Sequence, residues 1–268
     1  MSDGTDPIVE LAGWFRTAPG GYVRAWEQAR FDALVGDVFG YNALQLGMPD
    51  VDALRANRMP FKGYVGPCAP PPDAAGRWQG SVVALAGELP FETQSIDLLV
   101  LPHTLECTPD PHGVLREVER VLVPEGRVVI SGFNPWSLWG ARGRIPGMEP
   151  WLPQDPAAQV SLARLKDWFK LLSLEVDRGR YGCYAPPCRT DKWLARWGFM
   201  EKAGDRWWPV CGAVYVVSAV KRVAGMRLIG PAWKQKPRRA ARAAAQVAVP
   251  HGRAGLAGSP GRPFGGCR

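Results

Sequence analysis

The stretch Glu88–Gly132, ELPFETQSIDLLVLPHTLECTPDPHGVLREVERVLVPEGRVVISG, decides the fold. Its apolar run Ile96–Leu101 suits a strand that is buried on both faces, as in a parallel sheet. Asp110 and Pro111 then supply an N-cap and a proline at the first helical position. The helix that they begin carries its apolar residues at positions 114, 115, 118, 121 and 122. A second apolar segment, Arg127–Ser131, completes a strand–helix–strand unit, which predicts a right-handed crossover between parallel strands.

Further elements are predicted on both sides of this unit. Short apolar, β-branched segments predict strands at Asn42–Leu46, Phe61–Val65, Ser81–Ala86, Leu174–Arg180 and Val214–Val220. Helical spacing predicts helices within Pro7–Phe39, at Asp50–Asn57, at Ser161–Leu172 and at Asp191–Met200. Within the first of these, Gly20-Gly21 is expected to interrupt the helix. The prolines of Pro67–Gly76 predict a loop.

The net charge of +8 is concentrated at the end of the chain. Pro231–Arg268 holds eight of the 33 basic residues and no acidic residue, which leaves 25 basic and 25 acidic residues in Met1–Gly230. Residues 1–230 carry no net charge, so this part of the chain as a whole is not expected to attract nucleic acid electrostatically. The last segment is rich in Ala, Gly, Pro and Arg, so it is predicted to be a disordered basic tail.

Several classes of protein are disfavoured by the composition. The longest uncharged apolar run, Trp207–Val220, is too short to span a bilayer and contains a proline. Asp3 and Asp6 stand where a secretory signal would carry positive charge. The six cysteines are scattered and form no Cys-x-x-Cys pair, so reduced thiols in a cytoplasmic protein are expected and no metal site is predicted.

The stretch quoted above resembles the type 11 group of class I S-adenosylmethionine-dependent methyltransferases. That group has a Leu-Pro-Phe segment, an Asp that opens a strand, and a helix that ends in Leu-x-Pro-x-Gly. The matching residues here are Leu89–Phe91, Asp97, Leu105 and Leu122–Gly126. Over roughly Trp14–Lys221 the chain is also similar to proteobacterial proteins classed as methyltransferases of unassigned substrate, through Phe39–Gly47 and Gly132–Gly140.

This resemblance implies a Rossmann-like, doubly wound α/β fold. It implies a mostly parallel seven-stranded sheet whose last strand, Val214–Val220, is antiparallel. We therefore expect one methyltransferase-like domain over residues 1–230, with N-terminal helices at 7–39 and the Rossmann-like core at 40–223. Residues 231–268 form the predicted tail.

The cofactor implied by the resemblance is S-adenosylmethionine. In the family, the first strand leads into an acidic residue and a Gly-x-Gly-x-Gly segment, which lets the backbone approach the cofactor closely. Here Gln45 stands at the acidic position, and Gly47 alone remains of the glycines. The acid that would hold the ribose hydroxyls and the Asp before Ala86 are absent too, with Leu85 at the latter position. The residues assigned to the cofactor are Gln45, Leu46, Gly47, Ala86, Gly87, Glu88, Pro102 and His103.

Two candidate catalytic residues follow the predicted strand Ile96–Leu101, where an open α/β sheet places its ligand crevice. His103 is predicted to contact the cofactor or to act as a general base, since its pKa suits proton transfer near neutrality. Glu106 is the second candidate. The structural alternatives are a histidine hydrogen-bonded to backbone and a solvated or helix-capping carboxylate.

The function predicted from the sequence is methyl transfer from S-adenosylmethionine to an acceptor that the sequence does not identify. Two alternatives stay open: a catalytically inactive methyltransferase fold that serves as a binding or regulatory module, and a nucleic-acid methyltransferase tethered through its basic tail. We expect a methyl acceptor as partner, nucleic acid only through the tail, and no membrane. The oligomeric state is not determined.

Overall fold

The computed structural model describes residues 7–223 except 75, 146, 148–149, 154, 187 and 189. The predicted tail, 231–268, lies outside the described residues. Seven strands form one sheet: β1 Asn42–Leu46, β2 Phe61–Gly66, β3 Gly80–Val83, β4 Ile96–Pro102, β5 Leu122–Phe133, β6 Leu174–Gly182 and β7 Val214–Lys221. The α-helices are α1 Pro7–Trp14, α2 Ala18–Val35, α3 Pro111–Val121, α4 Leu138–Arg142, α5 Leu162–Leu171, α6 Asp191–Arg196 and α7 Phe199–Trp207. Three short 3₁₀ turns complete the set: η1 Pro72–Ala74, η2 Thr104–Glu106 and η3 Pro209–Cys211.

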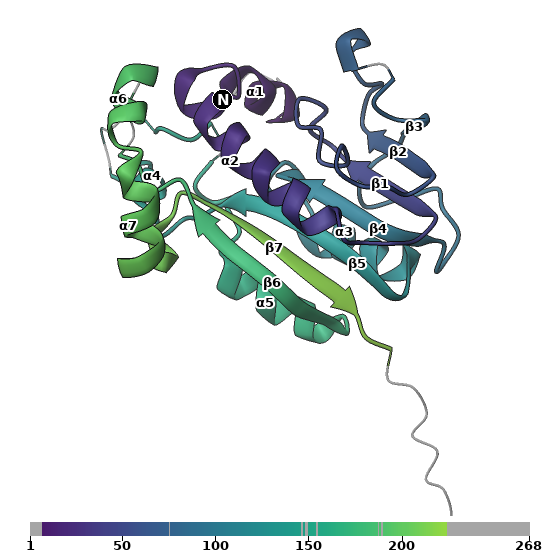
Figure 1. Cartoon of the computed structure of the whole chain (residues 1–268). Helices are drawn as coiled ribbons and strands as arrows, with labels where there is room; N and C mark the ends of the chain where they lie inside the picture. The colour runs from purple at the N-terminus through teal and green to yellow at the C-terminus, as the bar shows by residue number, and fades with distance from the viewer. Residues whose placement is uncertain are drawn as a thin grey trace, which may run out of the picture. The chain divides into compact units, whose positions relative to one another are not determined.

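The strand order is β3-β2-β1-β4-β5-β7-β6. Strands β1 to β5 pair in parallel, whereas β7 pairs antiparallel with both β5 and β6 (Figure 1). This order reverses between β1 and β4, the switch point at which doubly wound sheets bind their ligands. The predicted Rossmann-like sheet with an antiparallel last strand is confirmed.

Helices cover both faces of the sheet, and the strand residues divide between them by alternation. In β4, Leu99 and Leu101 join the core on the α3 and α5 side, while Leu98 and Val100 face α2 (Figure 1). The continuous apolar run of this strand is therefore buried on both faces, as the sequence predicts.

The predicted strand–helix–strand unit is confirmed in detail. The Asp110 carboxylate accepts a hydrogen bond from the Gly113 N–H at 2.9 Å and caps α3, with Pro111 in the first turn. The segment after α3 re-enters the sheet at Leu122, and β5 is longer than predicted, because Leu122 already pairs with Ile96 before a register shift.

The predicted break at Gly20-Gly21 is wrong. The chain leaves α1 after Trp14 and α2 begins at Ala18, with the Thr17 hydroxyl accepting a hydrogen bond from the Gly20 N–H at 3.3 Å. A Cβ on Gly20 would lie 2.1 Å from the Trp14 carbonyl oxygen. The glycine thus lets the first turn of α2 pack against the end of α1, rather than interrupting a helix.

Two other helix predictions need correction. Residues 50–57 form turns instead of a helix, because the Gln45 side chain satisfies their backbone groups, as described below. The predicted helix Asp191–Met200 is divided at Trp197-Gly198 into α6 and α7. Within the described residues no helix is long and apolar enough to cross a bilayer.

Candidate functional site

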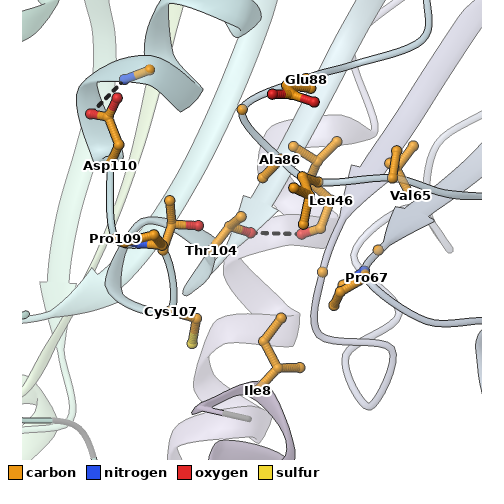
Figure 2. Close-up of a pocket in the computed structure, with 17 residues that line it drawn as sticks. Ile8, Leu46, Val65, Pro67, Ala86, Glu88, Thr104, Cys107, Pro109 and Asp110 are labelled. Carbon is orange, nitrogen blue, oxygen red and sulfur yellow. Dashed lines mark hydrogen bonds between the residues drawn. The ribbon is translucent and has the colours of Figure 1, made fainter.

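A pocket of about 440 Å³ lies at the carboxyl ends of β1, β2 and β4 (Figure 2). This is the edge at which open α/β sheets bind their ligands, and the volume is in the range of cofactor pockets. Its walls come from five places in the sequence: Ile8; Leu46-Gly47; Val65, Gly66 and Pro67; residues 84–88; and Thr104, 107–110 and Gly113.

The exit of β1 forms the floor of this pocket. Gly47 has φ +68°, in the left-handed region that favours glycine, and its N–H donates to the Val65 carbonyl at 2.8 Å. The Thr104 hydroxyl donates to the Leu46 carbonyl at 2.7 Å, as the dashed line in Figure 2 shows. Strand ends β1, β2 and β4 are therefore tied together at the pocket.

The structure brings five of the residues assigned to the cofactor together as pocket walls: Leu46, Gly47, Ala86, Gly87 and Glu88. The other three, Gln45, Pro102 and His103, are buried and are not among the lining residues. The sequence did not single out Ile8, Thr104, Cys107, Thr108, Pro109 or Asp110 as pocket residues. The helix cap at Asp110 was the one available signal, since a cap after a central strand lies at the ligand edge.

Gln45 organises the loop that follows β1. Its side-chain nitrogen lies 2.9 Å from the Met48 carbonyl oxygen and 2.7 Å from that of Val51, and its side-chain oxygen accepts from the Ala53 N–H at 3.1 Å. The side chain is fully buried. A carboxylate at this position could not donate to these carbonyls. The glutamine that replaces the family's acidic residue thus holds the loop after β1 in place through hydrogen bonds of its amide group.

His103 and Glu106 are held in a buried charged cluster with Glu27 of α2. The His103 Nε2 atom lies 2.8 Å from Glu27 Oε1, and Nδ1 lies 2.9 Å from Glu106 Oε2. A second oxygen of Glu106 accepts from the Phe133 N–H at 2.6 Å. The ring is fully buried, with the Phe133 ring centroid 4.3 Å away. We call Glu27, His103 and Glu106 the buried triad.

The geometry of the buried triad fits a charged histidine between two carboxylates, while burial also raises the pKa of Glu106. Ionised carboxylates only accept hydrogen bonds, so both ring nitrogens must donate, which a neutral imidazole cannot do. Burial alone would lower the pKa of His103, but the carboxylates of Glu27 and Glu106 outweigh it and raise the pKa to about 10. A protonated, enclosed imidazole with both nitrogens engaged supports a structural role for His103. It offers no free base to the pocket.

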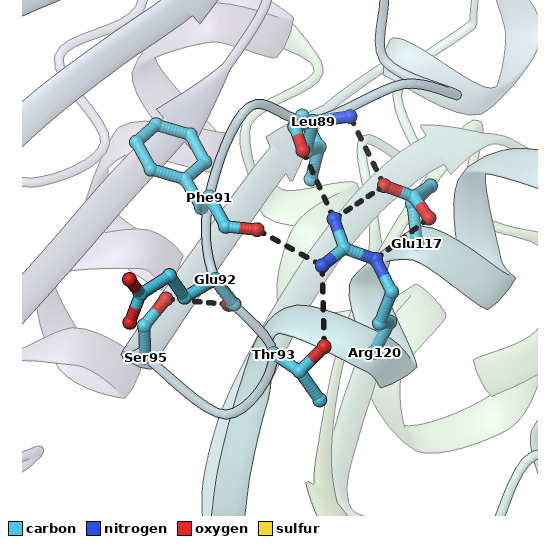
Figure 3. A network of polar contacts seen from close by, with 7 residues as sticks. All are labelled: Leu89, Phe91, Glu92, Thr93, Ser95, Glu117 and Arg120. Carbon is cyan, nitrogen blue, oxygen red and sulfur yellow. Dashed lines mark hydrogen bonds and ion pairs between the residues drawn. The ribbon is translucent and has the colours of Figure 1, made fainter.

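The segment after the pocket residues 86–88 is anchored to α3 by Arg120 (Figure 3). Its guanidinium donates to the carbonyls of Leu89 and Phe91, both at 2.9 Å, and pairs with Glu117 at 2.8 Å. Glu117 in turn accepts from the Leu89 N–H at 3.0 Å. The Leu-Pro-Phe segment is therefore a fixed turn that holds one wall of the pocket.

Replacing Arg120 with methionine keeps the apolar stem of the side chain and removes these bonds. We expect the free energy of unfolding to fall by about 1–3 kcal/mol, since the Leu89 and Phe91 carbonyls lose a charged donor. Arg116→Met is the matched control, because Arg116 is exposed on the same helix and lies 3.9 Å from Asp110. Urea unfolding should show the control within about 0.5 kcal/mol of the wild type; equal losses in both variants would refute the anchoring role.

The charged side chains that line the pocket are all acidic among the described residues. The described lining residues include two carboxylates, Glu88 and Asp110, and no Lys, Arg or His. Both are exposed, and Asp110 also caps α3. No group of three or more His, Cys, Asp or Glu side chains arranged to hold a metal ion is found in the described part of the chain.

Comparison with known proteins bears on this site. Residues 72–130 match the family model described as a methyltransferase domain. The uncharacterized protein YafS of Escherichia coli (strain K12) is 44% identical over 88 residues, which are 33% of this chain and 36% of YafS. A demethylmenaquinone methyltransferase of Tropheryma whipplei (strain Twist) is 29% identical over 93 residues, or 32% of this chain and 39% of that protein. The matched segments thus span well under half the length of these relatives.

Among solved structures, the chain is similar to one in the complex between the Haloferax volcanii Trm112 methyltransferase activator and a candidate methyltransferase. The TM-score is 0.55 and the identity 16%, over 80% of this chain and 96% of that one. This likeness concerns the fold. The matched family segment, 72–130, runs through β3, β4 and α3 into β5 and includes ten of the pocket's lining residues between Ala84 and Asp110, together with Gly113. The chain therefore carries a methyltransferase-domain segment, and it has the Rossmann-like fold of that similar structure.

Proposed function

We propose that this protein binds S-adenosylmethionine in the pocket of Figure 2 and transfers its methyl group to an acceptor. The observation that carries the proposal is the position of the pocket. It lies at the carboxyl ends of β1, β2 and β4, and most of its lining residues belong to the segment that matches the methyltransferase family. We place this activity in the cytoplasm, and the free thiols of Cys68, Cys183, Cys188 and Cys211 support this placement.

The residues present fit such a cofactor, although the family's acidic positions have changed. Gly47 has no side chain, so a cofactor can approach the backbone closely at the end of β1. A Cβ at this position would lie 3.3 Å from the Thr104 hydroxyl oxygen. S-adenosylmethionine carries a positive sulfonium, and carboxylates without basic neighbours among the lining residues favour a cation. Leu46, Gly47, Ala86, Gly87 and Glu88 would hold the cofactor, with Glu88 supplying the carboxylate that positions 45 and 85 lack.

The bound cofactor would supply an electrophilic methyl group, so the protein needs only to align an acceptor and exclude water. Ile8 of α1, Pro67 and Pro109 form an apolar rim that limits water at the pocket. Where the acceptor has to lose a proton, we assign the task to Glu88, since the other exposed carboxylate among the described lining residues, Asp110, caps α3. His103 is not assigned this task, since both of its nitrogens are engaged.

The direct test is calorimetric titration of the full chain with S-adenosylmethionine and S-adenosylhomocysteine. Submillimolar binding of both would support the proposal. Silence with both would contradict it and favour the alternative that the changed acidic positions suggest, a methyltransferase fold that serves as a binding module. The second alternative, nucleic-acid methylation through the tail, predicts that removing residues 231–268 abolishes RNA or DNA binding and its salt dependence.

Gly47→Ala tests the location of the cofactor. We expect S-adenosylhomocysteine affinity to fall at least tenfold, about 1.4 kcal/mol, because the new methyl group would enter the space between Gly47 and Thr104. The left-handed backbone would also cost about 1–2 kcal/mol of stability. Gly76→Ala is the matched control, since Gly76 has φ +92° but open space around its Cβ position and lies outside the pocket. Equal affinity in wild type and Gly47→Ala would place the cofactor elsewhere.

A further inference from the structure

Seven large apolar side chains are exposed in the part of the fold formed by α4, α6, α7 and η3. We call them the aromatic edge: Trp136, Leu138, Trp193, Phe199, Trp207, Trp208 and Val210. Trp136 is 74% exposed and Trp207 69%. Figure 1 shows α4, α6 and α7 along one side of the domain, beside the end of the sheet. Such a concentration of exposed tryptophan is unusual for a soluble surface and marks an interaction site.

The parts of the aromatic edge are linked by hydrogen bonds around Asn134. The side-chain nitrogen of Asn134 donates to the Val210 carbonyl at 2.8 Å, and its side-chain oxygen accepts from the Trp136 N–H at 3.1 Å. The turn before α4 and the turn η3 are therefore side by side. Since Trp207 and Trp208 directly precede η3, the exposed indoles of positions 136, 207 and 208 belong to neighbouring segments.

The charges of this region are complementary to an anionic surface. Between Lys192 and Val210 there are four basic residues, Lys192, Arg196, Lys202 and Arg206, and all four are exposed. Two acidic residues lie in the same range: Glu201 is half-buried and bonded to the protein, whereas Asp205 is exposed beside Arg180, so the basic residues outnumber the exposed acidic one. Glu201 accepts from the Tyr184 N–H at 2.9 Å and from the Tyr22 hydroxyl, and Asp205 lies 3.5 Å from Arg180.

We propose that the aromatic edge docks on an anionic phospholipid surface. Indole rings favour the boundary between water and hydrocarbon, because they join a large apolar body to a polar N–H. Exposed lysine and arginine around them add attraction to anionic headgroups. Arg196 and Arg144 already lie over the Trp193 and Trp136 rings, at 5.7 and 5.6 Å from the centroids, which places cations at the same level as the indoles.

This proposal revises the sequence-based expectation of no membrane partner. That expectation rested on the lack of a spanning segment, and a peripheral contact needs none. It is also independent of the proposed methyl transfer, because the aromatic edge shares no residue with the pocket.

Co-sedimentation with lipid vesicles tests the proposal. The full chain should bind vesicles of phosphatidylcholine mixed with phosphatidylglycerol and bind pure phosphatidylcholine vesicles weakly. Trp207→Ser/Trp208→Ser should lower the partition coefficient on the mixed vesicles at least tenfold. The matched control is Phe39→Ser/Tyr41→Ser, two aromatic residues on either side of Gly40 that are 80% and 76% exposed before β1, and it should bind like the wild type.

Binding through the tail and dimerisation through the aromatic edge are the two results that would contradict the proposal. The basic tail also attracts anionic lipid, but that attraction weakens with salt and does not depend on Trp207 or Trp208. Equal partitioning of the wild type and the tryptophan pair would assign all binding to the tail and overturn the proposal. The wild type could instead form a dimer in gel filtration and fail to bind vesicles. If the Trp207→Ser/Trp208→Ser variant then abolished the dimer, the aromatic edge would bind a second copy of the chain, and the proposal would be overturned. Lys202→Glu/Arg206→Glu should weaken vesicle binding independently of the tryptophans.

Discussion

Replacing His103 with alanine is expected to lower the free energy of unfolding by about 3–5 kcal/mol. The variant leaves Glu27 and Glu106 as buried carboxylates without their shared cation, and removing one partner of a buried ion pair has costs of this size. Urea unfolding of the purified variant measures the effect. His112→Ala is the matched control, because that histidine lies in the first turn of α3 outside the triad, and it should lose much less stability. A His103→Ala variant as stable as the wild type would refute the charged triad.

The same triad predicts a loss of stability at alkaline pH. The folded-state pKa of His103 is raised to about 10, above the ordinary value of 6.5. Its contribution is therefore fully present below about pH 6.5 and is lost as the pH rises through about 10. The stability difference between wild type and His103→Ala should accordingly shrink from pH 7 to pH 10.5. A constant difference over that interval would contradict a protonated His103.

Gln45→Glu restores the family's acidic residue and is nevertheless expected to destabilise the protein by about 3 kcal/mol or more. The new carboxylate would face the carbonyl oxygens of Met48 and Val51 in a fully buried position, without the two N–H donors of the amide. Chemical unfolding at pH 7 measures the loss.

The pH dependence of Gln45→Glu separates charge from shape. Burial would raise the pKa of the introduced carboxyl above its unfolded value. The variant's deficit should therefore be smaller near pH 4, where the group is protonated, and should grow as the pH rises. Gln45→Met, of similar size and uncharged, should show a deficit that does not change with pH. A Gln45→Glu variant that is stable at pH 7 would show that the loop tolerates the family pattern.

Local signals predicted most of the sheet and the central helix. The β4–α3–β5 unit follows from a continuous apolar run, an Asp-Pro cap and a helical stripe, all of which act over a few residues. The helix prediction at residues 50–57 failed for a nonlocal reason. The Gln45 side chain supplies partners to the backbone of Val51 and Ala53, and a side chain that competes for backbone groups is invisible to periodicity.

In the candidate site, too, local features could be predicted from the sequence and long-range contacts could not. The strand ends that line the pocket could be predicted, because parallel strands bring their carboxyl ends to one edge. The orientation of His103 could not, since its partner Glu27 lies 76 residues earlier, on a helix that packs there only in the folded domain. Ile8 carries no sequence signal for the pocket either; α1 brings it there through packing of Leu11 and Phe15.

The place of β7 has a consequence for the order in which the chain can fold during synthesis. Among the strands of the described residues this one comes last, yet it lies between β5 and β6, and within that part of the chain β6 pairs with no other strand. Until residues 214–221 have emerged from the ribosome, β6 therefore has no docking partner and β5 remains an open edge. An unpaired apolar edge invites association with other chains. Nascent or truncated chains that end before Val214 should thus depend on chaperones more than the full-length chain does.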